Sequence, residues 1–102
     1  MLKLNPNPTF WSKQKARIPG GEACDFEVEF RHMRREDLQT FMESAATRDE
    51  LAVIADIVAG WRGLDVDFTP ENLKSLLSNY PGLGSLLLSE YTSEMMRARV
   101  GN

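Results

Sequence analysis

The most constraining feature of this 102-residue sequence is a strict two-residue alternation over residues 24–31. Charged side chains alternate there with apolar ones, which are Cys24, Phe26, Val28 and Phe30. Because successive side chains of a strand point to opposite faces, the pattern predicts a β-strand with one apolar and one charged face. The preceding Pro19-Gly20-Gly21 is typical of a tight turn, since proline presets φ and glycine adopts positive φ. We therefore expect an antiparallel β-hairpin over residues 9–31.

The two expected strands carry opposite charges on their polar sides. Basic residues of the first strand can lie opposite acidic residues of the second and favour pairing; they are Lys13, Lys15 and Arg17, facing Asp25, Glu27 and Glu29. Cys24, the only cysteine, falls on the apolar side and is expected to be a small core residue rather than a reactive thiol. Residues 1–8 contain two prolines and two asparagines, so we expect a flexible lead-in there.

From about residue 35 the apolar positions change to helical spacing. A first stripe at i, i+3, i+4 and i+7 consists of Leu38, Phe41, Met42 and Ala45. The segment 47–50 matches a capping box, in which Thr47 caps the helix and Glu50 reaches back to it. We expect this second helix to continue to Trp61, to be buried at the centre through its broad apolar face, and to be closed by Gly60 and Gly63. Residues 62–68 are expected to form a connecting loop.

Two further helices are expected in the C-terminal part. Thr69 is a suitable cap, Pro70 suits the first helical position, and Pro81-Gly82 ends this third helix. The last helix is expected from about residue 83 to 99, with an apolar side formed by Leu83, Leu86, Leu87, Tyr91, Met95 and Ala98. The sequence thus predicts an α+β fold, an N-terminal antiparallel β-hairpin packed with about four α-helices. We expect a single domain over residues 1–102, with residues 35–102 as its helical part.

The charge distribution is uneven. The formal net charge of −3 divides into +3 over residues 1–35 and −6 over residues 36–102. This asymmetry would suit head-to-tail packing of copies, and chance produces it equally well in so short a chain. No apolar run approaches the roughly 18–20 residues that cross a bilayer, and the N-terminus lacks the apolar stretch of a signal peptide. We therefore expect a soluble, cytoplasmic protein without membrane contact.

The sequence contains no recognisable catalytic or metal-binding set of residues. His32 is the single histidine, and both a metal site and an acid–base site need companions, so we expect a solvated side chain. The acidic alternation over residues 65–71 resembles the start of a calcium loop, but Pro70 and Leu76 occupy positions where glycine and glutamate are required. We expect no enzymatic activity, no cofactor and no metal.

Nucleic-acid binding is disfavoured as well. Arg31, Arg34 and Arg35 form a small basic cluster that could touch phosphate, but Glu36 and Asp37 follow at once and the chain is acidic overall. The expected helices also offer few exposed basic or amide side chains for reading a DNA groove. We therefore expect no nucleic-acid partner.

The last helix has more apolar surface than one narrow stripe needs. Methionine adapts to varied partners because its side chain is unbranched and polarizable. We therefore predict partner contact or self-association through Leu88, Tyr91, Met95 and Met96. The competing interpretation is that Met95 or Met96 fills a gap in the core. Trp61 and Phe68 are expected to pack in the core, because aromatic residues at helix ends anchor loops to the interior.

An ordered set of motifs resembles a known family. The set contains a tryptophan that ends a helix, a Phe-Thr-Pro-Glu-Asn-Leu helix start, paired leucines, a Tyr-Pro-Gly break and a closing helix that ends near asparagine. It lies at residues 57–65, 68–73, 76–77, 80–82, 91 and 99–102. The chain is similar here to phage tail assembly chaperones of long-tailed phages and prophages. The resemblance covers residues 9–102, and residues 50–102 carry most of it.

This resemblance implies a non-enzymatic protein that binds the tape measure protein during tail morphogenesis. Such a chaperone keeps the tape measure protein soluble until tail tube subunits polymerise around it, and it is absent from the mature particle. The alternatives are a small protein-interaction adaptor and a DNA-binding regulator of a prophage. The chaperone role and the adaptor role both agree with a protein that works through an apolar helix surface.

Overall fold

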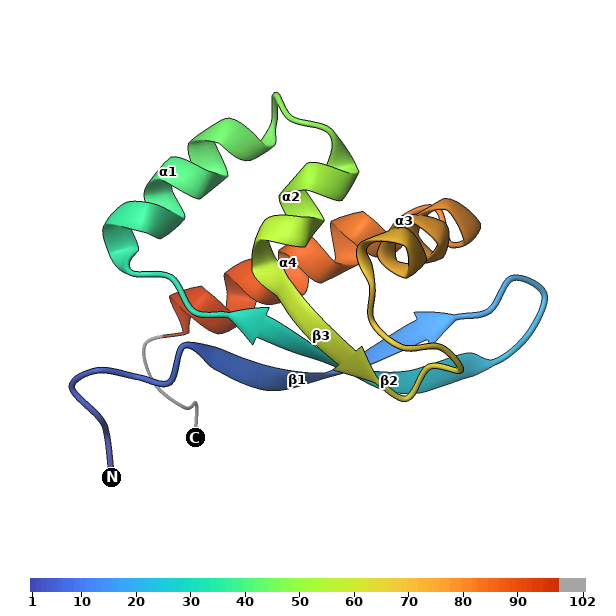
Figure 1. The fold of residues 1–102 in the computed structure, drawn as a ribbon, viewed down its shortest axis with the longest axis horizontal. Coiled ribbons are helices and arrows are strands. Elements are labelled where there is room, and N and C mark those ends of the chain that lie inside the picture. The colour runs from blue at the N-terminus through green and yellow to red at the C-terminus, as the bar shows by residue number, and fades with distance from the viewer. Residues whose placement is uncertain (98–102) are drawn as a thin grey trace.

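The computed structural model describes residues 1–97 and shows an α+β fold. Its elements in chain order are β1 (Thr9–Arg17), β2 (Ala23–Arg31), α1 (Arg35–Ala45), α2 (Glu50–Ile57), β3 (Val58–Arg62), α3 (Pro70–Asn79) and α4 (Leu83–Met96). Figure 1 shows the helices on one side of a three-stranded sheet, whose other side is open. The predicted hairpin and helical elements are thus present, together with one strand that was not expected. Ala98 and Arg99, assigned to the last helix from the sequence, lie outside the described residues.

The predicted hairpin is confirmed, and its charge pairing is confirmed for Lys13 and Lys15 but not for Arg17, which lies opposite Ala23. β1 and β2 are antiparallel, with Lys13 opposite Glu27 and Lys15 opposite Asp25. In the turn, Gly20 has φ 74°, a left-handed conformation that glycine adopts without steric cost. Residues 1–8 belong to no helix or strand, and all of them are exposed.

The second helix is shorter than predicted, because residues 58–62 form β3 rather than its last turns. β3 pairs antiparallel with β2 and gives the strand order β1-β2-β3. The Arg31 side chain donates to the carbonyl oxygens of Ala55 (2.9 Å) and Val58 (2.8 Å). It thereby satisfies carbonyl groups that the end of a helix leaves without partners. Pairing with an existing strand outweighs the helical periodicity that the sequence shows over this segment.

The two predicted helix caps have different outcomes. Thr69 is confirmed as the cap of α3, since its hydroxyl accepts from the backbone N–H of Asn72 at 3.0 Å. Thr47 is not the cap of α2, because its hydroxyl donates to the Ser44 carbonyl at the end of α1. Asp49 takes that role and accepts from the Ala52 N–H at 3.1 Å. Two capping residues stand within reach of this helix start, and the path of the connection from α1 selects between them.

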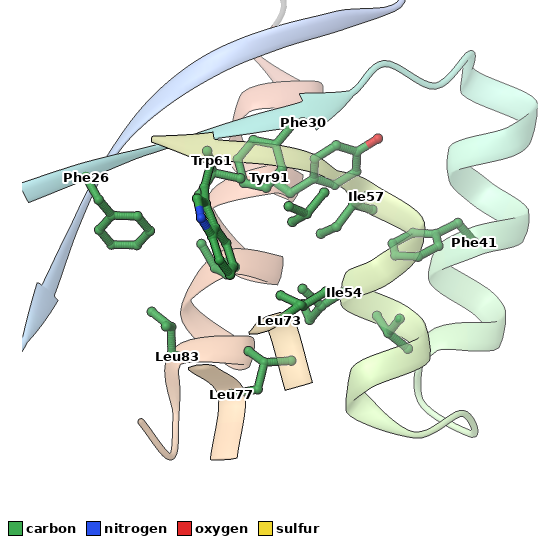
Figure 2. Close-up of a cluster of buried hydrophobic side chains, with 14 of the residues drawn as sticks. Phe26, Phe30, Phe41, Ile54, Ile57, Trp61, Leu73, Leu77, Leu83 and Tyr91 are labelled. Atoms are coloured by element: carbon green, nitrogen blue, oxygen red, sulfur yellow. The ribbon is translucent and has the colours of Figure 1, made fainter. Parts of the chain in front are cut away.

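One hydrophobic core lies between the sheet and the helices. Side chains from β2, β3 and all four helices meet there (Figure 2), among them Phe26, Phe30, Phe41, Ile54, Ile57, Trp61, Leu73, Leu77, Leu83 and Tyr91. Trp61 is buried as predicted and half-buried Phe68 packs against it, with ring centroids 5.0 Å apart and nearly perpendicular. The indole N–H donates to the Val66 carbonyl at 2.9 Å. Trp61 and Phe68 therefore fix the loop after β3 to the core.

The prediction that Cys24 is a core residue is wrong. The residues that begin β2, from Ala23 to Asp25, are all exposed, whereas burial starts at Phe26. Cys24 is on the apolar side of the alternation, but the turn end of the hairpin projects beyond β3 (Figure 1). Alternation tells which side of a strand faces the helices, but it does not tell how far the helices cover that side.

Candidate functional site

The structure separates the four residues predicted to bind a partner. Tyr91 has an exposed fraction of 0%, whereas Met96 is 67% exposed. Leu88 and Met95 lie between these limits, each half-buried and packed against the edge of the core. Three of the four residues therefore reach the surface, and the fourth does not.

Tyr91 belongs to the interior. Its ring packs edge-on against Phe30 at 5.2 Å and Phe41 at 6.2 Å between centroids. Its hydroxyl donates to the Arg31 carbonyl at 2.7 Å. Burial raises the pKa of Tyr91 to about 12 from its ordinary value of 10. This side chain ties α4 to the end of β2 and positions the exposed residues beside it.

An exposed residue of α1, Met42, adds to the surface of α4. Met42 is 37% exposed, and its sulfur lies 3.7 Å from the hydroxyl oxygen of Thr92 on α4. Leu88, Thr92 and Met95 are spaced at i, i+4 and i+7, so they share one side of α4. We call the apolar area that these residues form with Met96 the α1/α4 surface; its members are Met42, Leu88, Thr92, Met95 and Met96.

The sequence predicts Met42 in the apolar stripe of its helix, but its pattern does not connect Met42 with α4. In the structure, Leu38 and Phe41 of that stripe are buried, whereas Met42 lies at its margin. The width of the stripe could have indicated the exposure of Met42. Phe41 and Met42 are adjacent in sequence, and a helix turns by about 100° between them, so both cannot lie at the centre of the same side.

A small hollow continues the α1/α4 surface toward α2. Its volume is about 200 Å³, and Ala45, Leu88 and Gly84 contribute to its lining. Charged residues stand around it: Arg48 pairs with Asp56 at 2.7 Å, and its guanidinium lies 5.8 Å from the centre of the Phe41 ring. The side chain of Glu50 lies directly against Gly84, at a place where any Cβ would collide with it. The apolar surface is thus bordered by charges of both signs.

The open face of the sheet has a different character. Lys15 pairs with Asp25 at 3.2 Å, and Arg62 pairs with Glu27 at 3.1 Å. The hydrogen bond from Arg62 holds the pKa of Glu27 below its ordinary value of 4.5. Arg62 also lies 4.0 Å above the centre of the Trp11 ring, a favourable cation–π geometry. Lys15 and Arg62 are therefore both engaged with other side chains of this face.

The other polar candidates from the sequence lie at the surface or contact the backbone. His32 is exposed, and Arg31 is engaged with backbone carbonyl oxygens at the end of α2. Within residues 1–97, no group of three or more His, Cys, Asp or Glu side chains is arranged to hold a metal ion. None of the helices in this part of the chain has the length and apolar character that crossing a membrane requires.

Comparison with known proteins gives one clear relationship. The family model of the phage tail assembly chaperones matches residues 1–102, the whole chain. The match includes the N-terminal segment and hairpin, where the sequence motifs were weakest. Neither the curated proteins nor the solved structures include a significant match to the chain. The match over the full length shows that this protein belongs to the phage tail assembly chaperone family, whose members act during tail assembly in the host cell.

Proposed function

We propose that this chaperone binds the tape measure protein of its phage and keeps it soluble until tail tube subunits polymerise around it. The family supports a role in tail assembly through protein partners. The observation that carries the finer proposal is the α1/α4 surface, where Met42 and Met96 are exposed on neighbouring helices. We further propose that the protein works in the cytoplasm and is absent from the mature particle.

The chemistry of this surface suits an amphipathic helix of the partner. Methionine side chains are flexible and polarizable, so they pack against apolar stripes of varied shape. The charges around Arg48 and Glu50 can meet polar residues that flank such a stripe, as in helix-in-groove recognition. Leu88, Met95 and Met96 would contact the partner, and Tyr91 would hold α4 in place beneath them.

Moderate affinity for each copy agrees with this role. A chaperone that tail tube subunits displace must be released, and several copies on one long partner would supply the avidity that a single small surface lacks. A long partner with uncovered apolar stripes would otherwise associate non-specifically.

Co-expression with the tape measure protein tests the proposal. We expect the unaltered chaperone to keep the tape measure protein in the soluble fraction and to co-purify with it. The double variant Met42→Glu/Met96→Glu should leave the tape measure protein in the pellet, because a carboxylate at each position must lose its hydration on contact with an apolar stripe.

The control is a double variant that adds the same charge on the exposed side of α3, Ser75→Glu/Ser78→Glu. Its tape measure protein should remain soluble. Circular dichroism and thermal unfolding of the isolated chaperone variants establish that all of them fold. If the folded Met42→Glu/Met96→Glu variant retains and co-purifies the tape measure protein, the α1/α4 surface is not the binding site.

A further inference from the structure

β1 is the longer of the two strands that lie at the edges of the sheet. It contains nine residues, whereas β3 at the other edge contains five. An edge strand leaves every second residue with a backbone N–H and C=O that no neighbouring strand satisfies, so it can pair with a strand of another chain. Proteins use such pairing to bind extended segments of their partners. β1 therefore offers a longer template for this kind of contact than β3 does.

The hydrogen bonds at both ends of the hairpin show which backbone groups of β1 are free. The N–H of Ile18 donates to the carbonyl of Glu22 at 3.0 Å, and that of His32 donates to the carbonyl of Pro8 at 2.9 Å. Between these bonds the register is continuous, and opposed residues of an antiparallel pair alternate between hydrogen-bonded and non-hydrogen-bonded. The even-numbered residues of β1 therefore bond to β2, and the odd-numbered ones direct their N–H and C=O groups away from it. We call these outward groups the β1 edge; they belong to Thr9, Trp11, Lys13, Lys15 and Arg17.

The outer face beside the β1 edge is basic. Lys13, Lys15 and Arg17 are exposed there. Lys15 pairs with Asp25, whereas Lys13 and Arg17 form no ion pair with residues 1–97. An added strand would place its outer side chains directly beside those of β1, with Cβ atoms about 5 Å apart, and the acidic residues of β2 lie one strand further away. The outer face therefore favours carboxylates on the added strand.

The inner face beside the β1 edge has a different requirement. A groove of about 670 Å³ adjoins the edge and reaches α4, and its lining includes Gln14, Leu86 and Glu90. Leu86 is half-buried against the core, so an apolar side chain of an added strand would extend this contact. Glu90 is exposed beside it and disfavours another carboxylate at this place. Apolar side chains therefore suit the inner face, and they alternate with the carboxylates of the outer face.

A second copy of this chain does not supply that pattern from either edge of its sheet. Its β1 would bring basic residues beside Lys13 and Arg17, and like charges on neighbouring strands are destabilising. Its β3 has the sequence Val-Ala-Gly-Trp-Arg, which contains no acidic residue. Lysine on an edge strand guards against indiscriminate pairing. The same charges leave an acidic strand as the favoured partner.

We propose that the β1 edge binds an extended segment of a partner protein in which acidic and apolar residues alternate. The segment adds a fourth strand to the sheet and bonds to the odd-numbered residues of β1. Its carboxylates face Lys13 and Arg17, and its apolar side chains face Leu86. No residue of β1 belongs to the α1/α4 surface, so this contact is separate from the proposed binding of the tape measure protein.

Titration of the full-length protein with synthetic peptides tests the proposal. One capped peptide alternates glutamate with valine, and the control peptide has lysine in place of each glutamate. We expect the acidic peptide to bind about tenfold more tightly, because opposite charges on neighbouring strands stabilise pairing and like charges oppose it. The NMR shifts of the β1 amides measure both affinities. Equal affinities, or no binding of the acidic peptide, would overturn the proposal.

A charge reversal on β1 tests the assigned ion pairs. Lys13→Glu/Arg17→Glu should prefer the basic peptide to the acidic one. The matched control is Arg35→Glu/Lys74→Glu, which changes the net charge equally at exposed positions of α1 and α3 and should keep the preference for the acidic peptide. Circular dichroism establishes that both variants fold. A folded Lys13→Glu/Arg17→Glu variant that still prefers the acidic peptide contradicts the proposed charge contacts.

Hydrogen exchange separates strand addition from a contact made by side chains alone. In the free protein, the N–H groups of Lys13 and Lys15 should exchange faster than those of Ser12 and Gln14, which bond to β2. A saturating concentration of the acidic peptide should slow exchange at Lys13 and Lys15 by about tenfold or more and leave Ser12 and Gln14 little changed. Unchanged exchange at Lys13 and Lys15 would show that no strand is added, and the proposal would fail.

Proline at residue 13 provides a test of the backbone contact. Lys13→Pro removes an outward N–H, and an edge strand tolerates proline where that N–H faces solvent. Lys13→Ala loses the same charge and keeps the N–H, so Lys13→Pro should bind the acidic peptide a further two- to tenfold more weakly, roughly the value of one hydrogen bond. Equal affinities of the two variants would contradict the backbone pairing. None of these assays contains the tape measure protein, so their outcome is independent of the proposed chaperone function.

Discussion

The two faces of the sheet are built from the same strands and stabilise the protein in different ways. On the inner face, Phe26, Val28 and Phe30 are covered by helices and lose their contact with water. On the outer face, Lys15 and Arg62 form exposed ion pairs with neighbouring strands. Burial of a large apolar side chain contributes about 1.5–3 kcal/mol, whereas an exposed ion pair contributes at most about 1 kcal/mol. The inner face should therefore determine stability, and the outer face should contribute mainly to strand register and solubility.

The same comparison bears on where a partner binds. Lys15 and Arg62 on the outer face already have acidic partners within the sheet, so a second protein that binds there would have to replace those contacts. The α1/α4 surface leaves Met42 and Met96 in water, and covering them gains free energy without breaking an internal contact. This difference favours the helical side as the site for the proposed binding of the tape measure protein.

The sharpest test of the comparison is truncation on the inner face. Phe30→Ala removes a fully buried ring that packs against Tyr91, and we expect it to lower the free energy of unfolding by about 3–5 kcal/mol. Lys13→Ala, on the outer face of β1, should change it by no more than about 0.5 kcal/mol. Denaturant unfolding measures both variants. Comparable losses of unfolding free energy in the two variants would show that the inner face does not contribute more to stability than the outer face.

The next largest effect is expected from the hydrogen bond between the Tyr91 hydroxyl and the Arg31 carbonyl. Tyr91→Phe leaves the carbonyl of Arg31 without the hydroxyl that now donates to it, and we expect a loss of about 1–3 kcal/mol. The variant should also change the response to alkali. A tyrosine of the unfolded chain ionises near pH 10, whereas the pKa of Tyr91 is raised to about 12. Its stabilising contribution is therefore complete below pH 10 and is lost as the pH rises toward 12.

Denaturant unfolding measured between pH 9 and 12 tests whether stability falls as the pH rises. The unaltered protein should lose more stability over this interval than Tyr91→Phe does, because the variant has no phenol to ionise. Identical slopes for the two proteins would contradict the assigned burial of the hydroxyl.

A smaller effect is expected for the aromatic residue of the outer face. Trp11→Ala removes the ring beneath Arg62 and should lower the free energy of unfolding by about 0.5–1 kcal/mol. Trp11→Phe keeps an aromatic face and should recover part of that loss. Thermal unfolding of the two variants separates the ring contact from the change in side-chain size. An equal loss for both would show that Arg62 gains nothing from the ring.

The smallest expected effect is a change in the pKa of one carboxyl group, that of Glu27. The pKa of Glu27 lies below 4.5 because Arg62 hydrogen-bonds to the ionised form, so the contribution of this pair is present above pH 4.5 and is lost as the pH falls through the lowered pKa. An NMR titration of the Glu27 carboxyl resonance should show its pKa rising in Arg62→Gln. If the pKa of Glu27 is the same in Arg62→Gln as in the unaltered protein, the observed pairing is contradicted.

Part of the candidate site could be predicted from the sequence. The excess of apolar residues in the last helix predicts surface positions for Leu88, Met95 and Met96, which lie at or near its surface. The same prediction includes Tyr91, which is buried, because apolar composition does not separate the buried part of a helix from its exposed margins. The sequence places Met42 only in the apolar stripe of its own helix, because its position beside Thr92 depends on how α1 lies against α4. Which residues form a surface together is a property of packing between elements.

The sequence alone determined the features that arise within a few residues of one another: the alternating strands, the Pro-Gly-Gly turn and the Thr69 cap of α3. Each depends on local backbone geometry and side-chain spacing, which the order of residues specifies directly. Only the tertiary structure decided that residues 58–62 pair as β3, that Asp49 rather than Thr47 caps α2, and that Cys24 lies beyond the cover of the helices. These outcomes depend on contacts between segments distant along the chain, where the free energy of strand pairing and burial exceeds the small preferences of local sequence.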